Sequence, residues 1–218
     1  MIFKGEGNWS ISDKNVRFFI KQFPPHLRDE ILSVLNQIKF LGRGDIEDGI
    51  SEAISKVCRN DDPAFHIVPF TPSGGQQVRS AIKPIFEKNK FSDTVFLHAS
   101  LSDALRESGD DDRIIFVDDH IASGTQAVAQ LKAFMNELPD NERDPNIILE
   151  PLVDELRIKF RKMKFSFALI AVRDDGQKKI RNISKRLKLN HENLTIETQD
   201  VFTDLIPTCK KIDSLVFC

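Results

Sequence analysis

The stretch Arg113-Ile114-Ile115-Phe116-Val117-Asp118-Asp119-His120-Ile121-Ala122-Ser123-Gly124-Thr125-Gln126 decides the fold expected for this chain. Its continuous apolar run, Ile114–Val117, is typical of a strand that is covered on both faces of a parallel sheet. Two carboxylates, Asp118 and Asp119, follow the run, and a loop of small residues then leads into an amphipathic helix. Because ligands of open parallel sheets bind beyond the carboxyl ends of the strands, the segment predicts a binding site at Asp118 and Asp119.

The loop after the two carboxylates has the chemistry of a phosphate site. Gly124 lets the backbone approach a ligand closely, and Ser123 and Thr125 place hydroxyl groups at the start of the helix. The free amides and the dipole of a helix N-terminus favour an anion. Acceptors for sugar hydroxyls therefore stand beside donors for a phosphate, and a ribose 5-phosphate needs both. A helix-capping turn without a ligand is the alternative, but the strand before the carboxylates and the Gly-Thr step favour a site.

The chain from residue 61 to residue 218 alternates short apolar runs with helical patterns, which predicts a doubly wound α/β domain with a mainly parallel sheet. The strands are expected at Phe65–Phe70, Thr94–His98, Arg113–Asp118, Phe165–Val172, Leu194–Thr198 and Leu215–Phe217. The helices are expected at Gly75–Asn89, Thr125–Leu138, Asp154–Lys164 and Gln177–Leu189, the third of them as a solvated helix. The polar, proline-punctuated segment Asn136–Pro151 is interpreted as a surface excursion.

Residues 1–60 predict a helical lead-in that precedes this domain. Apolar residues recur at helical spacing in Val16–Phe23, in Leu27–Ile38 and in Ile46–Val57, and Asp45 is placed to cap the third helix. Three short amphipathic helices cannot bury their apolar faces alone. We therefore expect this N-terminal helical subdomain to pack on the residues that follow it.

The composition excludes several classes of protein. A net charge of −2 provides no field to hold a polyanion, so nucleic-acid binding is not indicated. No apolar run reaches the length of a signal peptide or a membrane span, which predicts a cytoplasmic protein that does not bind membranes. The three cysteines, Cys58, Cys209 and Cys218, are widely spaced and are expected to be free thiols.

The segment Ile114–Thr125 resembles the binding loop of the type I phosphoribosyltransferases, in which an apolar strand, two acidic residues and a small-residue loop precede Gly-Thr or a close variant. The resemblance implies a phosphoribosyltransferase-like fold and a phosphorylated ribose or nucleotide ligand. Asp118 and Asp119 would act as the catalytic carboxylates that hold the ribose hydroxyls, directly or through Mg²⁺. The 5-phosphate would be bound by Ile121, Ala122, Ser123, Gly124 and Thr125.

A second match lies upstream and in the expected order. In the family, the first core strand is followed by a loop whose backbone amides hold the diphosphate. Here Phe65–Phe70 is followed by Ser73, Gly74 and Gly75, which suit such a loop, and Arg79 adds a positive charge one turn into the next helix.

More narrowly, the chain is similar to the phosphoribosyltransferase-like proteins of bacterial conflict and antiphage systems. The similarity rests on the helical lead-in, Val16–Val57, and on the Ser123-Gly124 step in the Asp-Asp loop. It implies a role in antiphage defence and a protein partner encoded nearby. Those relatives also continue past the point where this chain stops.

This difference in length and a difference in one loop leave catalysis open. Transferases of this fold close a loop over the reacting centre, whereas Ala99–Asp112 is short and acidic. A module that senses a nucleotide without turning it over is therefore the main alternative to an enzyme. His120 has no settled role in the family pattern, and a space-filling or supporting role is favoured. For Asp174 and Asp175, a turn into the next helix is favoured over contact with an acceptor base.

A response-regulator receiver is a third alternative, because receivers also begin with an apolar strand that ends in Asp-Asp. A receiver needs a lone phosphoacceptor aspartate at the end of a later strand, and Asp174 is the nearest candidate. Asp174 lies far along the chain, and too little sequence follows Asp119 for the remaining strands and helices. The pattern therefore favours the phosphoribosyltransferase-like fold.

Overall fold

The computed structural model describes residues 3–4, 10–11, 13–37, 43–58, 62–70, 82, 93–139 and 151–198. The chain forms two compact units, one of residues 1–46 and 202–218 and the other of residues 47–201. Helix α3, Arg43–Val57, crosses the boundary between them, so the helices expected as one lead-in are divided between two units.

The described residues of the first unit form a pair of short strands and two helices. Strands β1 (Phe3–Lys4) and β2 (Ser10–Ile11) pair antiparallel. Helix α1 (Asp13–Ile20) is followed by a 3-10 turn, η1 (Pro25–Leu27), and by helix α2 (Arg28–Gln37). Pro24 and Pro25 end the first helix because a proline ring blocks the helical hydrogen bond, so both helices lie where the apolar spacing predicted them.

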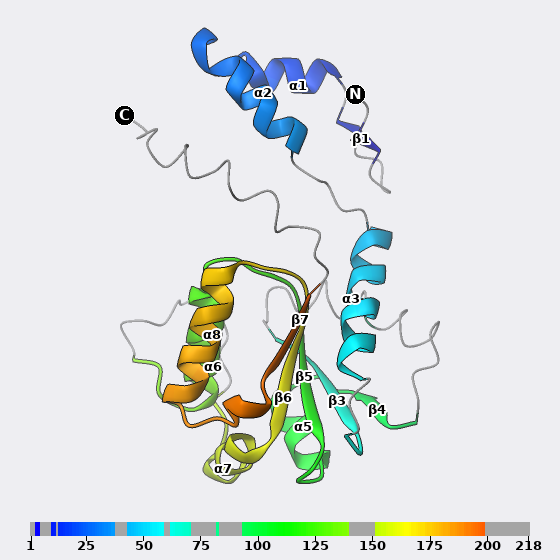
Figure 1. Cartoon of the computed structure of the whole chain (residues 1–218), viewed down its shortest axis with the longest axis vertical. Coiled ribbons are helices and arrows are strands. Elements are labelled where there is room, and N and C mark those ends of the chain that lie inside the picture. The colour runs from blue at the N-terminus through cyan, green and yellow to red at the C-terminus, as the bar shows by residue number, and fades with distance from the viewer. Residues whose placement is uncertain are drawn as a thin grey trace. The chain divides into compact units, whose positions relative to one another are not determined.

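The second unit is built on a five-stranded parallel sheet, which confirms the predicted α/β class (Figure 1). Its strands are β3 (Phe65–Pro69), β4 (Val95–Leu97), β5 (Arg113–Ile121), β6 (Lys164–Val172) and β7 (Thr195–Thr198). Its helices are α5 (Leu101–Glu107), α6 (Thr125–Phe134), α7 (Asp154–Lys162) and α8 (Asp174–Arg186), with a 3-10 turn, η3 (His191–Asn193). The expected strand Leu215–Phe217 and most of the expected helix Gly75–Asn89 lie outside the described residues.

The strand order is β4-β3-β5-β6-β7, with every neighbouring pair parallel. From β3 the chain moves outward to β4 and then returns to the other side of β3 to form β5. The direction of winding therefore reverses between β3 and β5. In a doubly wound fold, ligands bind in the crevice at this reversal, beyond the carboxyl ends of the two strands.

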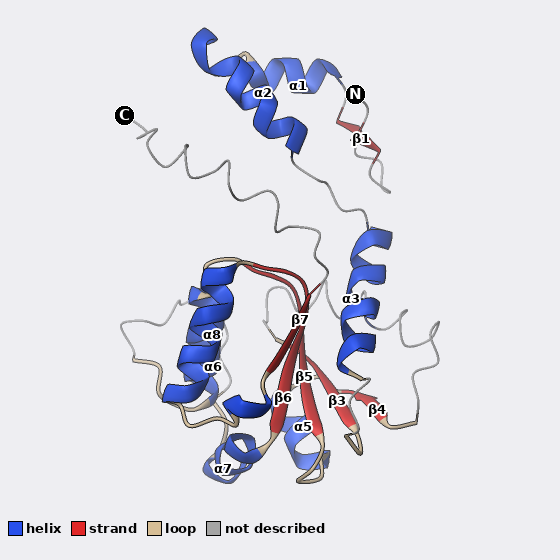
Figure 2. Cartoon of the chain, in the orientation of Figure 1, coloured by secondary structure: helices blue, strands red, loops and turns tan. Residues whose placement is uncertain are grey.

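Helices cover both faces of the sheet. One large cluster joins buried side chains of the central strands to α5, α6, α7 and α8, with Leu105, Leu131, Phe160 and Ile183 among the helical members. Figure 2 shows α6 and α8 on one side of the sheet and α3 on the other. The residues of α3 that belong to this unit bury Ile50, Ala53, Ile54 and Val57. Coverage on both faces explains the unbroken apolar run of β5.

Phenylalanine forms the centre of the larger cluster. The chain has seventeen phenylalanines and no tyrosine. Six of these rings form a network with centroid distances from 4.9 to 6.4 Å, most of them edge-on: Phe70, Phe116, Phe134, Phe160, Phe165 and Phe167. A tyrosine in such a position would need a hydrogen-bond partner for its hydroxyl group, and phenylalanine needs none.

Several predicted boundaries were wrong. Strand β5 continues to Ile121 instead of ending at Asp118, because β6 offers Ala171 and Val172 as partners. Helix α8 begins at Asp174, three residues before the predicted Gln177. Helix α7 is not fully solvated, since its apolar residues Leu156 and Phe160 are buried. In the described part of the chain, no helix is long and apolar enough to span a membrane.

Candidate functional site

The two carboxylates at the end of β5 differ in exposure. Successive side chains of a strand point to opposite faces. Asp118 follows the pattern of Ile114 and Phe116 and is only 4% exposed, whereas the side chain of Asp119 is 43% exposed. Asp118 Oδ1 accepts a hydrogen bond from the backbone N–H of Asp119, at 2.9 Å. Asp119 is therefore the accessible carboxylate, and Asp118 supports the backbone that carries it.

His120 is paired with Asp119. Asp119 Oδ1 lies 2.7 Å from the backbone nitrogen of His120 and 2.9 Å from its ring Nδ1. The hydrogen bond from His120 holds the pKa of Asp119 below its ordinary value, although burial opposes this shift. The same hydrogen bond raises the pKa of His120, again against burial. The imidazole is 63% exposed, so His120 does not fill space in the core but lies at the rim beside Asp119.

The loop that follows β5 leads into the N-terminus of helix α6, which has no side-chain cap. Gly124 is the N-cap residue of α6 and has the left-handed backbone angles φ 74° and ψ 3°. No side chain caps the first amides of α6, and its first turn contains no acidic residue. The hydroxyl groups of Ser123 and Thr125 lie 3.2 Å apart, and both residues are exposed together with Ala122. The arrangement leaves hydroxyl donors and the positive end of a helix dipole available to an anion.

Sequence reasoning missed Gly176, which holds this loop from the other side. A methyl group on Gly176 would lie 2.4 Å from the carbonyl oxygen of Ala122, and one on Gly124 would lie 2.9 Å from the Cα of Gly176. The backbone N–H of Arg173 also donates to the carbonyl of Ile121, at 3.0 Å. The start of α8 is therefore packed directly on the loop. Because the sequence predicted a turn before a helix starting at Gln177, Gly176 gave no sign of a packing role; only the start of α8 at Asp174 places it inside the helix.

Asp174 and Asp175 belong to the first turn of α8. Asp175 also forms an ion pair with Arg173, at 3.1 Å. Two carboxylates in a first turn interact favourably with the helix dipole, and they repel a further anion. Of the two helices that begin near the carboxyl edge of β5 and β6, α6 is therefore the one suited to bind a phosphate.

The other predicted site residues are placed as follows. Ile121 is buried at the end of β5, and its side chain lies beside Gly176 at the start of α8. The predicted diphosphate loop, Ser73, Gly74, Gly75 and Arg79, lies outside the described residues. The structure does describe the end of β3, which precedes this loop. There Pro69 of β3 pairs with Val117 of β5. Any loop that leaves β3 therefore starts at the same edge as Asp119.

The segment between β4 and β5 is a packed helix. Helix α5 occupies half of Ala99–Asp112, and Leu101, Ala104 and Leu105 are buried. Ser100 caps the helix by accepting from the backbone N–H of Asp103, at 3.1 Å. The acidic segment is thus ordered by its own apolar face and its cap.

The carboxylates at the end of β5 suit Mg²⁺ as a shared ion. Among the described residues no group of three or more histidine, cysteine or acidic side chains is arranged to hold a metal. Mg²⁺ keeps several waters and is commonly bound through one or two carboxylates together with substrate phosphates. Asp119, with Asp118 behind it, fits that mode of binding and not a closed metal cage.

Comparison with known proteins identifies the family. No curated protein and no solved structure matches the chain. The family model PRTase-CE matches residues 16–211, which is most of the chain and includes the whole described sheet. Together with the parallel sheet and the Asp-Asp loop at the end of β5, the match shows that this chain belongs to the phosphoribosyltransferase-like family PRTase-CE.

Proposed function

We propose that the chain binds 5-phosphoribosyl 1-diphosphate, or a related nucleotide or sugar phosphate, together with Mg²⁺. The observation that supports this most directly is the geometry at the end of β5. There a half-exposed carboxylate, Asp119, stands next to the uncapped N-terminus of α6, at the reversal of the sheet order. The carboxylate suits the ribose hydroxyls, and the amides and hydroxyls of the loop suit the 5-phosphate.

In the proposed transfer, the bond between the anomeric carbon and the diphosphate oxygen breaks, and a nucleophile, commonly a base nitrogen, bonds to that carbon. Diphosphate leaves with its electron pair, and the nucleophile loses its proton to solvent. Mg²⁺ would neutralise the leaving group. Asp119 would bind the sugar hydroxyls and Asp118 would hold the backbone of Asp119, so that the chain contributes mainly position and charge.

Asp119→Asn is expected to weaken the binding of 5-phosphoribosyl 1-diphosphate by roughly tenfold or more, because a charge-assisted hydrogen bond contributes about 1.5–3 kcal/mol. Titration calorimetry with Mg²⁺ measures the change. Asp175→Asn is the matched control, since its carboxylate is 47% exposed and lies on the neighbouring helix. Equal affinity in the two variants contradicts the proposed role of Asp119, and no binding by the unaltered chain contradicts the function itself.

A sensor that binds the same ligand without turnover is the second candidate. The packed α5 favours it, because the segment that would have to close over the reacting centre is fixed in the core through Leu101, Ala104 and Leu105. Release of diphosphate from the donor, with Mg²⁺ and a mixture of bases, separates the two candidates. Release above the rate without protein supports the transferase, and binding without release supports the sensor.

We further propose that the chain acts in bacterial antiphage defence with a partner encoded nearby. The helical lead-in and the Ser123-Gly124 step support this proposal, since both resemble proteins of such systems. Plaque formation on cells that carry the gene and its neighbours, with and without Asp119→Asn, is the relevant measurement. Equal plaque numbers with and without the genes, across a phage panel, contradict the role.

A further inference from the structure

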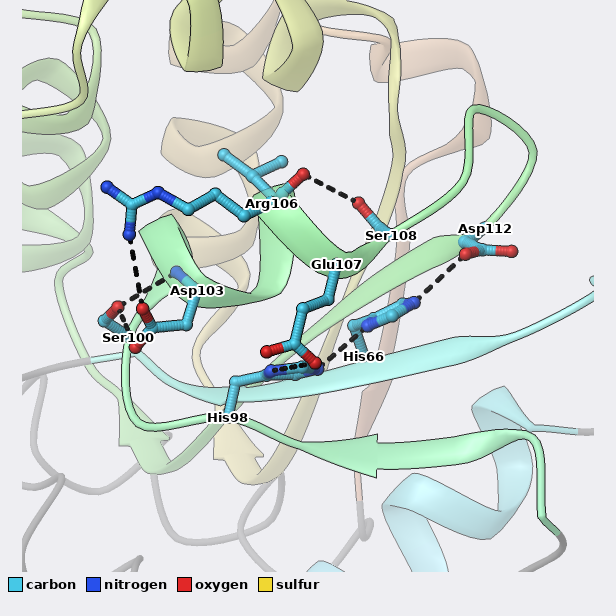
Figure 3. Close-up of polar contacts among 9 residues, drawn as sticks. His66, His98, Ser100, Asp103, Arg106, Glu107, Ser108 and Asp112 are labelled. Atoms are coloured by element: carbon cyan, nitrogen blue, oxygen red, sulfur yellow. Dashed lines mark hydrogen bonds and ion pairs between the residues drawn. The ribbon is translucent and has the colours of Figure 1, made fainter.

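Two buried imidazoles meet where the edge strand β4 lies beside β3 (Figure 3). His66 lies within β3 and is 3% exposed, and His98 directly follows β4 and is 8% exposed. His66 Nδ1 is 2.8 Å from His98 Nε2, and the rings are stacked with centroids 5.0 Å apart. The backbone N–H of His98 also donates to the carbonyl of Ile67, at 2.9 Å.

The partner of His66 on its other side fixes the position of one proton. His66 Nε2 lies 3.0 Å from Asp112 Oδ2, and this oxygen also accepts from the backbone N–H of Gly109, at 2.6 Å. An ionised carboxylate can only accept, so His66 Nε2 carries a hydrogen. The contact between the two rings then requires one hydrogen between Nδ1 of His66 and Nε2 of His98, and one of these nitrogens must be bare.

This arrangement limits how many protons the two histidines can hold. When both rings are neutral, His98 donates to His66, and the remaining nitrogen, His98 Nδ1, lies 3.9 Å from Glu107 Oε2. One added proton is accommodated there, beside that carboxylate. A second added proton would place two N–H groups against each other at 2.8 Å. The folded pair therefore holds one added proton, whereas two free histidines hold two.

The charged groups around the pair are consistent with this limit. Burial lowers the pKa of His98, and the charge of His66 lowers it further, while the carboxylates of Glu107 and Asp103 on α5 oppose the shift. Asp112 faces His66 from the turn before β5. From α7, the Lys159 ammonium donates to the Ser108 carbonyl at the end of α5. The nearby negative charges favour the first added proton, and the contact between the rings excludes the second.

The pair joins the edge strand β4 to the rest of the sheet. Strand β4 is an edge strand of three residues, and its large side chains Phe96 and Leu97 are 43% and 39% exposed. Apolar burial therefore contributes little to holding β4, which is attached by its backbone pairing with β3, by the stacking of Phe96 on His66, and by the contacts of His98 with His66 and Ile67. Helix α5 follows within a few residues and faces His98 with Glu107.

We propose that the His66–His98 pair makes the attachment of the edge strand β4, residues 95–97, to β3 dependent on pH. The segment stays on β3 while the pair holds at most one added proton, and it opens when both rings are protonated. An opened segment takes up one proton more than the closed one below the ordinary histidine pKa of about 6.5. Its opening constant is therefore expected to rise about tenfold for each pH unit below about 6.

Hydrogen exchange, corrected for the intrinsic pH dependence of the exchange rate, tests this proposal. We expect protection of peptides from residues 93–99 to fall about tenfold between pH 6 and pH 5, while β6 and α8 change far less. In His98→Gln the amide still donates to His66 but cannot titrate, so the fall should disappear. His26→Gln, an exposed histidine of the first unit, is the control and should behave as the unaltered chain. An equal fall in His98→Gln overturns the proposal.

Side-chain ¹⁵N NMR of the unaltered chain gives an independent answer that does not depend on a variant folding. At pH 7.5 we expect a scalar coupling through the hydrogen bond between His98 Nε2 and His66 Nδ1. The coupling should vanish over the pH range in which protection is lost. Absence of the coupling at pH 7.5, or its persistence after both rings are protonated, overturns the proposal.

Discussion

Asp62→Ala is expected to lower the free energy of unfolding of the sheet unit by about 3–5 kcal/mol, a large part of the stability of an ordinary domain. The side chain of Asp62 is 4% exposed and receives Arg113 Nε at 2.5 Å and Lys164 Nζ at 2.6 Å. Arg113 is itself buried and donates from Nη1 to Ser166 Oγ and to the carbonyl of Asn193. Removing the carboxylate leaves a buried guanidinium without its counter-charge, and this cost exceeds the loss of one hydrogen bond.

Urea denaturation followed by circular dichroism measures the effect. Glu137→Ala is the control, because Glu137 and Arg161 form an exposed pair at 3.7 Å that contributes at most about 1 kcal/mol. Burial acts to raise the pKa of Asp62, but the hydrogen bonds from Arg113 and Lys164 outweigh it and hold the pKa below its ordinary value. The contribution of Asp62 is therefore complete above the unfolded pKa of about 4 and is lost as the pH falls below it. Equal losses for Asp62→Ala and Glu137→Ala would contradict this account.

The sequence predicted β5 and α6 well because both depend on local pattern. Four apolar residues before two carboxylates indicate a buried strand, and the helical spacing after Gly124 indicates a helix. The end of β5 was wrong for a physical reason. The apolar run stops at Val117, but hydrogen bonding with β6 continues to Ile121, and polarity along one strand does not report its pairing with another.

Asp118 and Asp119 lie near the end of β5, as expected, but the sequence did not predict that their exposures differ. Ile115 and Val117, on the same face of the strand as Asp119, are fully buried, so the exposure of Asp119 reflects its place near the end of the strand. The partners of Asp62 were beyond prediction, since Arg113 is 51 residues away and Lys164 is 102 residues away. Only the folded sheet brings these charges together.

Gly176→Ala is expected to weaken the binding of ribose 5-phosphate by about a hundredfold while the chain still folds. The added methyl group would lie 2.4 Å from the carbonyl oxygen of Ala122, and because the obstacle is backbone, either the loop or the start of α8 must move. Overpacking of this kind costs about 1–3 kcal/mol of stability, which a domain can tolerate. A displacement of about 1 Å in a binding loop can cost a hundredfold in function. Calorimetry with ribose 5-phosphate, and thermal melts of the same samples, separate the two effects.

Gly109→Ala is the matched control, because its methyl group would meet only the Asp112 side chain, with 3.3 Å as the shortest approach. That variant should bind ribose 5-phosphate as the unaltered chain does. Full affinity in Gly176→Ala, in a chain whose binding depends on Asp119, would mean that the 5-phosphate is held away from the loop of residues 121–125. The two variants test the loop independently, because Asp119 lies on strand β5 and Gly176 lies on helix α8. A ligand that loses affinity in both variants must lie where β5, α6 and the start of α8 meet.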